Sequence, residues 1–456
     1  MTRCHAQVRQ IRRLRRLLTL VALGSVLGHL LSTARAQTTN EGAYAIDLLT
    51  ALRLAGAQNL DLQIAREHLQ EAQANRQSAV EQFLPWIAPS VTYHRRDGVA
   101  QAVPGGTISD AHFQSYSPGV ALTAQVTLGD AIYNSLAAKQ LVRASDQALE
   151  AQRQEATFNA AQGYFDLVEA KALVEVVRQA QATSQDYQQQ LHVAVGAGIA
   201  FRGDELRVQS QTEHYGILLR RALERQRVAA ASLAQLLHLD SRIELVPQGT
   251  DLVPLRLFET NAPMDALVEQ ALAARPDLKQ SQAVVSAARA EKNGAVFGPL
   301  IPSLNAQAYG GGLGGGPDGG PSNFGAEGDY AVGLSWKIGP GGLFDPGRTR
   351  ANKARVAAAE LNSTKLKDAV VSEVVSGLVH VRSLAGQIEL AQHNLTTADE
   401  TLRLTRERKQ EGVGIVLEYI QAEQDLTQAR SEYVSALAEH NKAQYALSKA
   451  VGGLPR

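Results

Sequence analysis

Carboxylates follow two glycine turns at matching distances, and these are the residues whose type and spacing could act on charged solutes. Asp204 lies six residues after Gly198, with Glu205 beside it, and Glu418 lies six residues after Gly412. A carboxylate in the first turn of a helix is stabilised by the helix dipole, by about 0.3–1 kcal/mol. Around a symmetry axis the same carboxylates would form a ring that attracts cations, repels anions and raises the pKa of each member. Both interpretations stay open at this point.

The other reactive side chains show no arrangement that predicts catalysis. The histidines lack the H-E-x-x-H spacing of a metal site, and no G-x-S-x-G motif positions a nucleophile. Cys4 is the only cysteine, so the rest of the chain has no thiol for a disulfide or a metal. We therefore expect no catalytic residues, no metal, no cofactor and no enzyme activity.

The elements that carry the two turns form a long repeat. The two glycines are 214 residues apart, nearly half of the 456 residues, and a repeat of this length determines the fold. Each half has the expected order helix, strand, loop, strand, long helix, glycine turn, helix. We expect the first structural repeat over residues 37–240, a linker over 241–263, the second structural repeat over 264–453, and a C-terminal tail over 454–456.

Residues 1–36 have the composition of a signal peptide, because arginines precede the apolar stretch Leu17–Leu31 and Ala34-Arg35-Ala36 provides a cleavage pattern. The alternative is an N-terminal membrane anchor. Seven of the 45 Lys and Arg residues and none of the 45 Asp and Glu residues lie in this leader, so the remaining chain has a net charge of −7. That charge argues against a nucleic-acid partner. After Ala36 no apolar run reaches the length of a membrane-spanning helix.

Four segments alternate apolar and polar residues with period two, the pattern of β-strands. They lie near residues 87–95, 118–128, 303–310 and 329–338. Segments of about ten residues with one apolar face are typical of transmembrane barrels, and the alternative is a half-buried sheet in a soluble domain. Because the chain is otherwise mainly helical and carries an export signal, we favour the membrane interpretation.

The connections within both strand pairs are expected to be loops. Asp97–Ser115 is polar, and Gly310–Gly328 is dense in glycine, which predicts a mobile segment. The glycines do not indicate a phosphate site, because no G-K-[ST] follows them.

Two helices are expected to be very long, over Asp130–Val195 and Arg348–Glu411. A helix of about 65 residues spans roughly 100 Å, which favours a coiled coil over an ordinary domain. The last helix has a seam with heptad spacing, formed by Leu426, Ala429, Tyr433, Ala436, His440, Ala443 and Leu447. The same spacing occurs 214 residues earlier. A single polar residue in such a seam more often fixes the register of the packed helices than binds a ligand.

Four strands cannot close a barrel within one chain. Open strand edges are not tolerated in hydrocarbon, because each unpaired backbone group costs several kcal/mol there. The membrane interpretation therefore requires an oligomer whose strands join into one barrel. Long helices packed as a cylinder would continue that barrel as a tube, so the sequence favours a conduit.

The chain resembles the TolC-like outer-membrane efflux proteins over nearly its whole length after the leader. The resemblance rests on the duplicated plan, on ARPDL (Ala274–Leu278), on GLFDPG (Gly342–Gly347), and most on the paired turns GAGIAFRGDELRVQ (Gly196–Gln209) and GVGIVLEYIQAE (Gly412–Glu423). Each motif is weak alone, but their order and duplication together are specific.

The resemblance implies a mainly α protein with a small transmembrane β part. It implies a homotrimer with a twelve-stranded barrel in contact with outer-membrane lipid, continued by an α-helical coiled-coil tunnel in the periplasm. It also implies a periplasmic adaptor and an inner-membrane RND pump or ABC exporter as partners. The protein would then be the passive duct of an efflux or type I secretion system.

The resemblance also assigns roles to the turns. The family carries acids at its periplasmic constriction, and the matching positions are Glu418 and Gln421. Asp204, which corresponds to Glu418 in the first repeat, and its neighbour Glu205 are further candidates for the aperture. The family has a basic residue four positions before the first acid, and this chain has Gly414 there. The contacts that this basic residue makes in the family's gate therefore cannot be assigned to this chain. The tips that would meet the adaptor are Gly196, Gly198, Gly412, Val413 and Gly414.

A periplasmic coiled-coil adaptor or structural protein is the alternative function. An adaptor would have one helical hairpin between other modules, whereas this sequence predicts two equivalent hairpins with strands at the opposite end. The transported substrate, the particular pump and the means of opening are not specified by the sequence.

Overall fold

The computed structural model describes residues 44–456 apart from 102–104, 250–251, 317–322, 412–413 and 454–456. The predicted leader, and the tip residues Gly412 and Val413, lie outside the described residues. The elements of the first half are β1 (Tyr44–Ile46), α2 (Leu48–Gln58), α3 (Leu60–Glu81), β2 (Trp86–Gln101), β3 (Ile108–Thr127), α4 (Leu128–Gly196), α5 (Arg202–Leu236) and β4 (Leu245–Pro247). Those of the second half are α6 (Met264–Ala274), α7 (Pro276–Phe297), the 3₁₀ turn η1 (Gly298–Leu300), β5 (Ser303–Gly316), β6 (Gly325–Ser335), α8 (Pro346–Gln410) and α9 (Val416–Val451).

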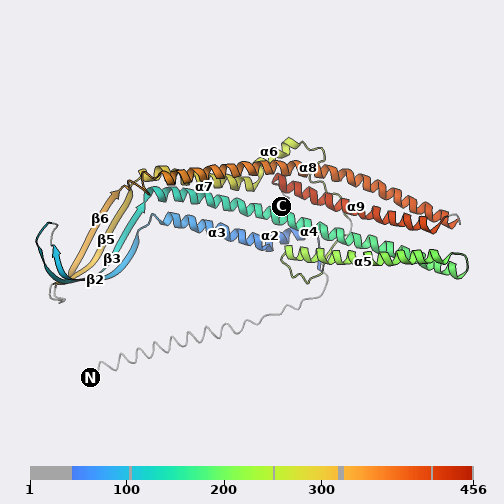
Figure 1. The fold of residues 1–456 in the computed structure, drawn as a ribbon, viewed down its shortest axis with the longest axis horizontal. Coiled ribbons are helices and arrows are strands. Elements are labelled where there is room, and N and C mark those ends of the chain that lie inside the picture. The colour runs from blue at the N-terminus through green and yellow to red at the C-terminus, as the bar shows by residue number, and fades with distance from the viewer. Residues whose placement is uncertain (1–43, 102–104, 250–251, 317–322, 412–413, 454–456) are drawn as a thin grey trace, which may run out of the picture. The chain divides into compact units, whose positions relative to one another are not determined.

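The order from α2 to α5 therefore returns from α6 to α9 (Figure 1). Local sequence explains where several helices begin. Asp47, Asn59 and Asp345 each accept a hydrogen bond from a backbone N–H of the first turn, which satisfies a donor that the helix itself leaves free. Pro276 and Pro346 occupy first helical positions, where the missing N–H has no cost.

The four long strands form one antiparallel sheet in the order β2-β3-β5-β6. Directly opposed residues of antiparallel strands share a face, so the register defines an apolar and a polar face. The apolar face includes Ile87, Val91 and Tyr93 on β2, Tyr116, Val120, Leu122, Ala124 and Val126 on β3, Leu304, Ala306 and Ala308 on β5, and Tyr330, Val332 and Leu334 on β6. Within the described residues, β2 and β6 each have one unpaired edge.

The strands are longer than the sequence predicted. β2 and β3 include most of Asp97–Ser115, which we expected to be a loop. The expectation of a mobile loop over Gly310–Gly328 was also wrong for both ends of that segment, because β5 continues to Gly316 and β6 begins at Gly325. Conversely, residues 336–338, which we expected to belong to the fourth strand, lie beyond the end of β6.

Aromatic side chains explain the glycines of β5. A Cβ at Gly312 would lie 2.2 Å from Phe324, and one at Gly314 would lie 2.6 Å from Tyr116. These two rings stack with centroids 6.1 Å apart. Glycine at both positions lets the rings lie flat against the strand, so the glycine-rich segment is part of the sheet.

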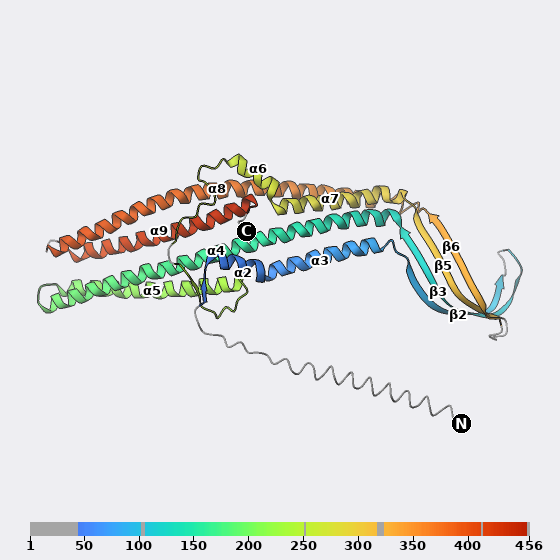
Figure 2. The same cartoon turned by 180° about the vertical axis from the view of Figure 1, so that it is seen from behind.

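The long helices form two hairpins that continue from the sheet (Figures 1 and 2). α4 packs against α3 and α7 and, toward its C-terminal end, against α5 and α9, while α8 packs against α7 and α9. One core cluster lies between α6, α7, α8 and α9, and includes Val374, Leu378 and Leu447. A second joins α2, α4 and α5, and a third, which we call the tip cluster, joins α4, α5, α8 and α9 around Tyr187, Val208, Leu402, Tyr419 and Leu426.

In the part of the chain that the structure describes, one helix, within Pro346–Lys409, is long and apolar enough to cross a membrane by length and composition, which the sequence analysis did not predict. Its apolar residues include Val370, Val374 and Val381, which lie in the first core cluster against α6 and α9. Packing within the chain thus buries 28% of the apolar window.

The linker between the repeats is bound to the helices. β4 pairs in parallel with β1, and further on α9 holds the linker backbone through two amides. Leu255 N–H donates to Asn441 Oδ1 at 2.8 Å, and Phe258 N–H donates to Gln444 Oε1 at 2.9 Å. The segment that we expected to be a linker is thus held against α9 by hydrogen bonds to two buried amide side chains.

Candidate functional site

The two hairpin turns use glycine in different ways. Gly198 has a φ of +73°, a conformation that other residues rarely adopt, and the turn is closed by Ile199 N–H donating to Ala194 O at 2.9 Å. Gly196 has open space around it. In the second turn Gly414 N–H donates to Arg408 O at 3.1 Å, and a Cβ there would lie 3.0 Å from a backbone nitrogen of the preceding helix.

Apolar side chains project from both turns. Ile199 is 82% exposed and Phe201 74% exposed, and Ile415 and Leu417 are more than half exposed. Neither turn has an internal core to cover these side chains, and sequence reasoning singled out the glycines and not these neighbours. Exposed apolar patches of this kind are typical of protein contact sites.

Glu205 is a buried link between α5 and the preceding helix. Its Oε1 lies 2.8 Å from His192 Nδ1, and its other oxygen accepts from Arg202. The hydrogen bonds from His192 and Arg202 lower the pKa of the Glu205 carboxyl. Its neighbour Asp204 lies 3.7 Å from Arg207 Nη1. The first-repeat carboxylates are thus paired within their own hairpin.

Glu418 lies in the first turn of α9, where its Oε2 is 3.4 Å from Arg408 Nη1. A basic partner therefore reaches this acid from the last turn of α8, although Gly414 occupies the position where the family places one. Gln421 is exposed and donates to Asp425 Oδ1 at 2.9 Å. No hydrogen bond or ion pair between described residues joins Glu418 or Gln421 to Asp204 or Glu205.

A group of aromatic and cationic side chains, which sequence reasoning missed, lies just above the turns. Lys409 Nζ stands 3.4 Å from the ring centroid of Tyr187, and the rings of Tyr187 and Tyr419 are 4.3 Å apart. A polar cavity of about 460 Å³ adjoins them, lined also by Asp186 and Arg406. The contact ties α8 to α4 near the tip. Its residues come from three helices, so no local motif could have identified it.

The sheet separates charge from apolar surface. On the apolar face, none of the described residues between the level of Val126 and the level of Tyr116 on β3 is charged, including the residues opposite them on the neighbouring strands. Asn305, Gln307 and Asp329 lie on the polar face, as does Glu327. Such a division is required of a sheet with lipid on one side and water on the other.

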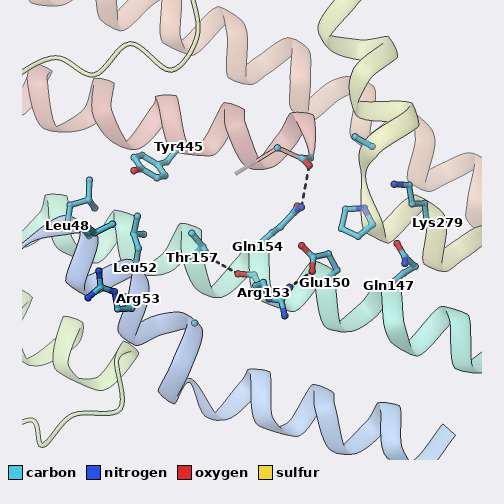
Figure 3. Close-up of a pocket in the computed structure, with 16 residues that line it drawn as sticks. Leu48, Leu52, Arg53, Gln147, Glu150, Arg153, Gln154, Thr157, Lys279 and Tyr445 are labelled. Carbon is cyan, nitrogen blue, oxygen red and sulfur yellow. Dashed lines mark hydrogen bonds and ion pairs between the residues drawn. The ribbon is translucent and has the colours of Figure 1, made fainter. Parts of the chain in front are cut away.

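A groove lies between α2, α4 and the ends of α7 and α9 that face them (Figure 3). Its volume is about 1160 Å³, and it is lined by the apolar side chains of Leu48, Leu52 and Tyr445 and by polar residues of α4. Arg153 on α4 is paired with Glu150 at 2.7 Å. Among the described residues no cluster of three or more His, Cys, Asp or Glu side chains could hold a metal ion.

The fold and the tips define a class of protein. An open sheet with one uncharged and one polar face, continued by two helical hairpins, has the surfaces expected of a sheet that contacts lipid on one side and water on the other. Residues 267–453 match the family model described as outer membrane efflux protein. The second repeat of the chain is therefore similar to outer membrane efflux proteins.

Solved channels share this fold at low sequence identity. The CmeC outer membrane channel of Campylobacter jejuni is 18% identical, with a TM-score of 0.75, 89% of this chain and 85% of that chain being covered. The outer membrane protein VceC of Vibrio cholerae is 18% identical, with a TM-score of 0.74 and coverage of 89% and 96%. The MtrE outer membrane channel of Neisseria gonorrhoeae, in its open state, is 19% identical, with a TM-score of 0.71 and coverage of 89% of each chain.

A curated relative is similar in sequence over part of its length. Nodulation protein T of Rhizobium leguminosarum bv. viciae is 24% identical over 270 residues, which are 58% of this chain. The chain spans about half, 53%, of that relative.

Proposed function

We propose that three copies of this chain form one twelve-stranded barrel and one helical tunnel, and that solutes pass through them from the periplasm to the exterior. A periplasmic adaptor and an inner-membrane RND pump or ABC exporter would deliver the solutes and supply the energy. The match of residues 267–453 to the outer membrane efflux protein family supports the role of efflux duct. The trimer, the partners and the solute path are part of the same proposal.

The uncharged face of the open sheet is the observation that carries this proposal. It covers eleven residues along β3, from Val126 to Tyr116, which are separated by ten residue steps. At about 3.3 Å per residue and a tilt of about 40°, the face is about 25 Å tall, the height of the apolar band of an outer-membrane barrel. Its two unpaired edges need partners in lipid, and the edges of further copies supply them.

The polar face of the same sheet supports a water-filled interior. Asn305 Nδ2 donates to Ser335 Oγ at 3.1 Å across β5 and β6, and the face has no apolar band comparable to the opposite one. Closure with this face inward would give a hydrated lumen, as in other channel-forming barrels.

The first test is the oligomeric state of the full chain in membranes. We expect a heat-labile, SDS-resistant trimer in the outer-membrane fraction. Recovery as a soluble periplasmic monomer would overturn the duct and would favour the coiled-coil adaptor as the alternative.

The aperture is proposed to lie at Glu418, with Gln421 beside it and Asp204 and Glu205 on the neighbouring hairpin. The Glu418 side chain is 41% exposed, so passing ions can reach its carboxyl group. Glu418→Gln should reduce the block of the channel by divalent cations and leave trimer formation unchanged. Unchanged block would leave Glu418 only its interactions with Arg408 and with the helix dipole.

The tips are proposed to receive the adaptor through the exposed apolar side chains of both turns. Gly196, Gly198 and Gly414 shape these turns, and Gly412 and Val413 belong to the same proposal. A helical hairpin of the adaptor could cover Ile199, Phe201 and Ile415 and remove their apolar surface from water.

A further inference from the structure

Glu423 is a buried carboxyl group in the tip cluster, where the two hairpins meet. Its residue is 3% exposed, and it lies on α9 between Tyr419 and Leu426, which belong to that cluster. Its Oε1 is buried and has no hydrogen-bond partner among the described residues. A buried polar atom without a partner costs about 1–3 kcal/mol, and more if it is charged, so its position calls for a physical reason.

Polar and titratable groups lie on each helix of the tip cluster. Tyr215 on α5 and Arg406 on α8 are close enough to Glu423 to interact with it electrostatically, and Tyr187 on α4 belongs to the tip cluster. The hydroxyls of Tyr215 and Tyr187 are likewise buried without partners among the described residues, as is the Nε2 of Gln211 on α5. Four polar groups without partners therefore lie on the helices that meet at the tip cluster.

The charges near the cluster do not neutralise an ionised Glu423 by contact. Arg406 lies close enough to favour the charged form electrostatically, but no ion pair joins the two. Lys409 is engaged with the Tyr187 ring, and Asp186 is a further negative charge near Tyr419. Burial outweighs the field of Arg406 and raises the pKa of Glu423 to about 7.

The repeat shows that the fold does not require this acid. The matching position in the first repeat, 214 residues earlier, is Gln209, which is half-buried and cannot ionise. Only the second hairpin therefore carries a group at this position that changes charge.

We propose that Glu423 gates the periplasmic end of the duct. While its carboxyl is neutral, it can donate to a neighbouring oxygen, and the hairpin of α8 and α9 stays packed against α4 and α5. When it ionises, the uncompensated charge favours hydration of the cluster, because a buried charge without a partner is costly. The hairpins then separate and the tunnel end widens. This inference rests on the proposed duct function.

The test is the pH dependence of conductance of the purified full chain in planar bilayers, for the wild type, Glu423→Gln and a matched control. Glu432→Gln is that control, because it removes an exposed carboxyl from the same helix. We expect the wild type and the control to conduct more as the pH rises through about 7, by at most about tenfold per pH unit for one titrating group. Glu423→Gln should stay at the low-pH conductance throughout.

A distance between the hairpins gives a second readout that does not depend on current. Spin labels at Gln189→Cys on α4 and Gln421→Cys on α9, both exposed positions, should move apart above pH 7 in the wild type and not with Glu423→Gln. An unaltered pH profile and unaltered label distances in Glu423→Gln would overturn the gate. If the wild type passed no current at any pH, the duct proposal would fail, and the label distances would still decide the role of Glu423.

Discussion

Carboxyl groups at the tip have different surroundings in the two repeats. Glu205 is buried between a histidine and an arginine, whereas Glu418 is half-exposed beside Arg408 and Glu423 is buried with one oxygen unpaired. Pairing favours the ionised form and unpaired burial favours the neutral form. The first repeat thus uses its acid to fasten its own turn, and the second has acids that remain responsive to ions and protons.

Glu205→Gln should lower the melting temperature of the helices by a few degrees at neutral pH, because His192 and Arg202 lose an ionic partner. Since these partners lower the pKa of Glu205, its contribution to stability is present above the ordinary glutamate pKa of 4.5 and is lost as the pH falls below that value. Melting followed by circular dichroism checks this.

The melting temperatures of the wild type and Glu205→Gln should converge in acid. Glu213→Gln, which removes an exposed carboxyl from the same helix, should match the wild type at every pH. A constant difference between the wild type and Glu205→Gln down to the most acid pH would show that the loss is steric.

At the scale of elements, β5 depends on glycine where aromatic rings cross it. Gly312→Ala should reduce the yield of SDS-resistant trimer, because its Cβ would lie 2.2 Å from the Phe324 ring. Gly310→Ala is the matched control, since it lies on the same strand and face, with no neighbour within 4 Å of its Cβ. Equal yields of trimer from the two variants would contradict the role of the stacked rings.

The hairpin turns make a separate prediction. Phe201→Ser should weaken retention of the proposed periplasmic adaptor, because a largely exposed aromatic ring would no longer be covered on binding. Ile217→Ser, at a 52% exposed position on α5 beyond the turn, should retain the adaptor as the wild type does. Pull-down on immobilised channel measures both, and equal retention by the two variants would remove Phe201 from the contact.

The sequence predicted the elements better than their ends. Period two located four strands, and heptad spacing located the seam of α9, because those patterns are local. The extension of β5 through its glycines could not be predicted from the local sequence, because the aromatic rings that cover these glycines belong to Tyr116 and Phe324, which lie outside β5. The pairing of Glu205 with His192 and of Glu418 with Arg408 depends on how two helices meet, which spacing within one motif does not specify.

At the scale of the whole molecule, one chain has the surfaces that one wall segment of the proposed channel requires. Its sheet has a lipid-compatible face of the required height and a polar face behind it, but two open edges. Its hairpins end in turns with exposed apolar residues. Edges and tips are the surfaces that the isolated chain leaves unpaired, so both indicate assembly: edges with further copies, and tips with a partner protein.

Single-channel recording of the purified full chain in planar bilayers tests the central claim most directly. We expect discrete current steps of one uniform size from a preparation whose mass is that of a trimer, and Glu418→Gln should change their block by divalent cations. A preparation that inserts as a trimer and passes no current on either side of pH 7 would contradict the duct.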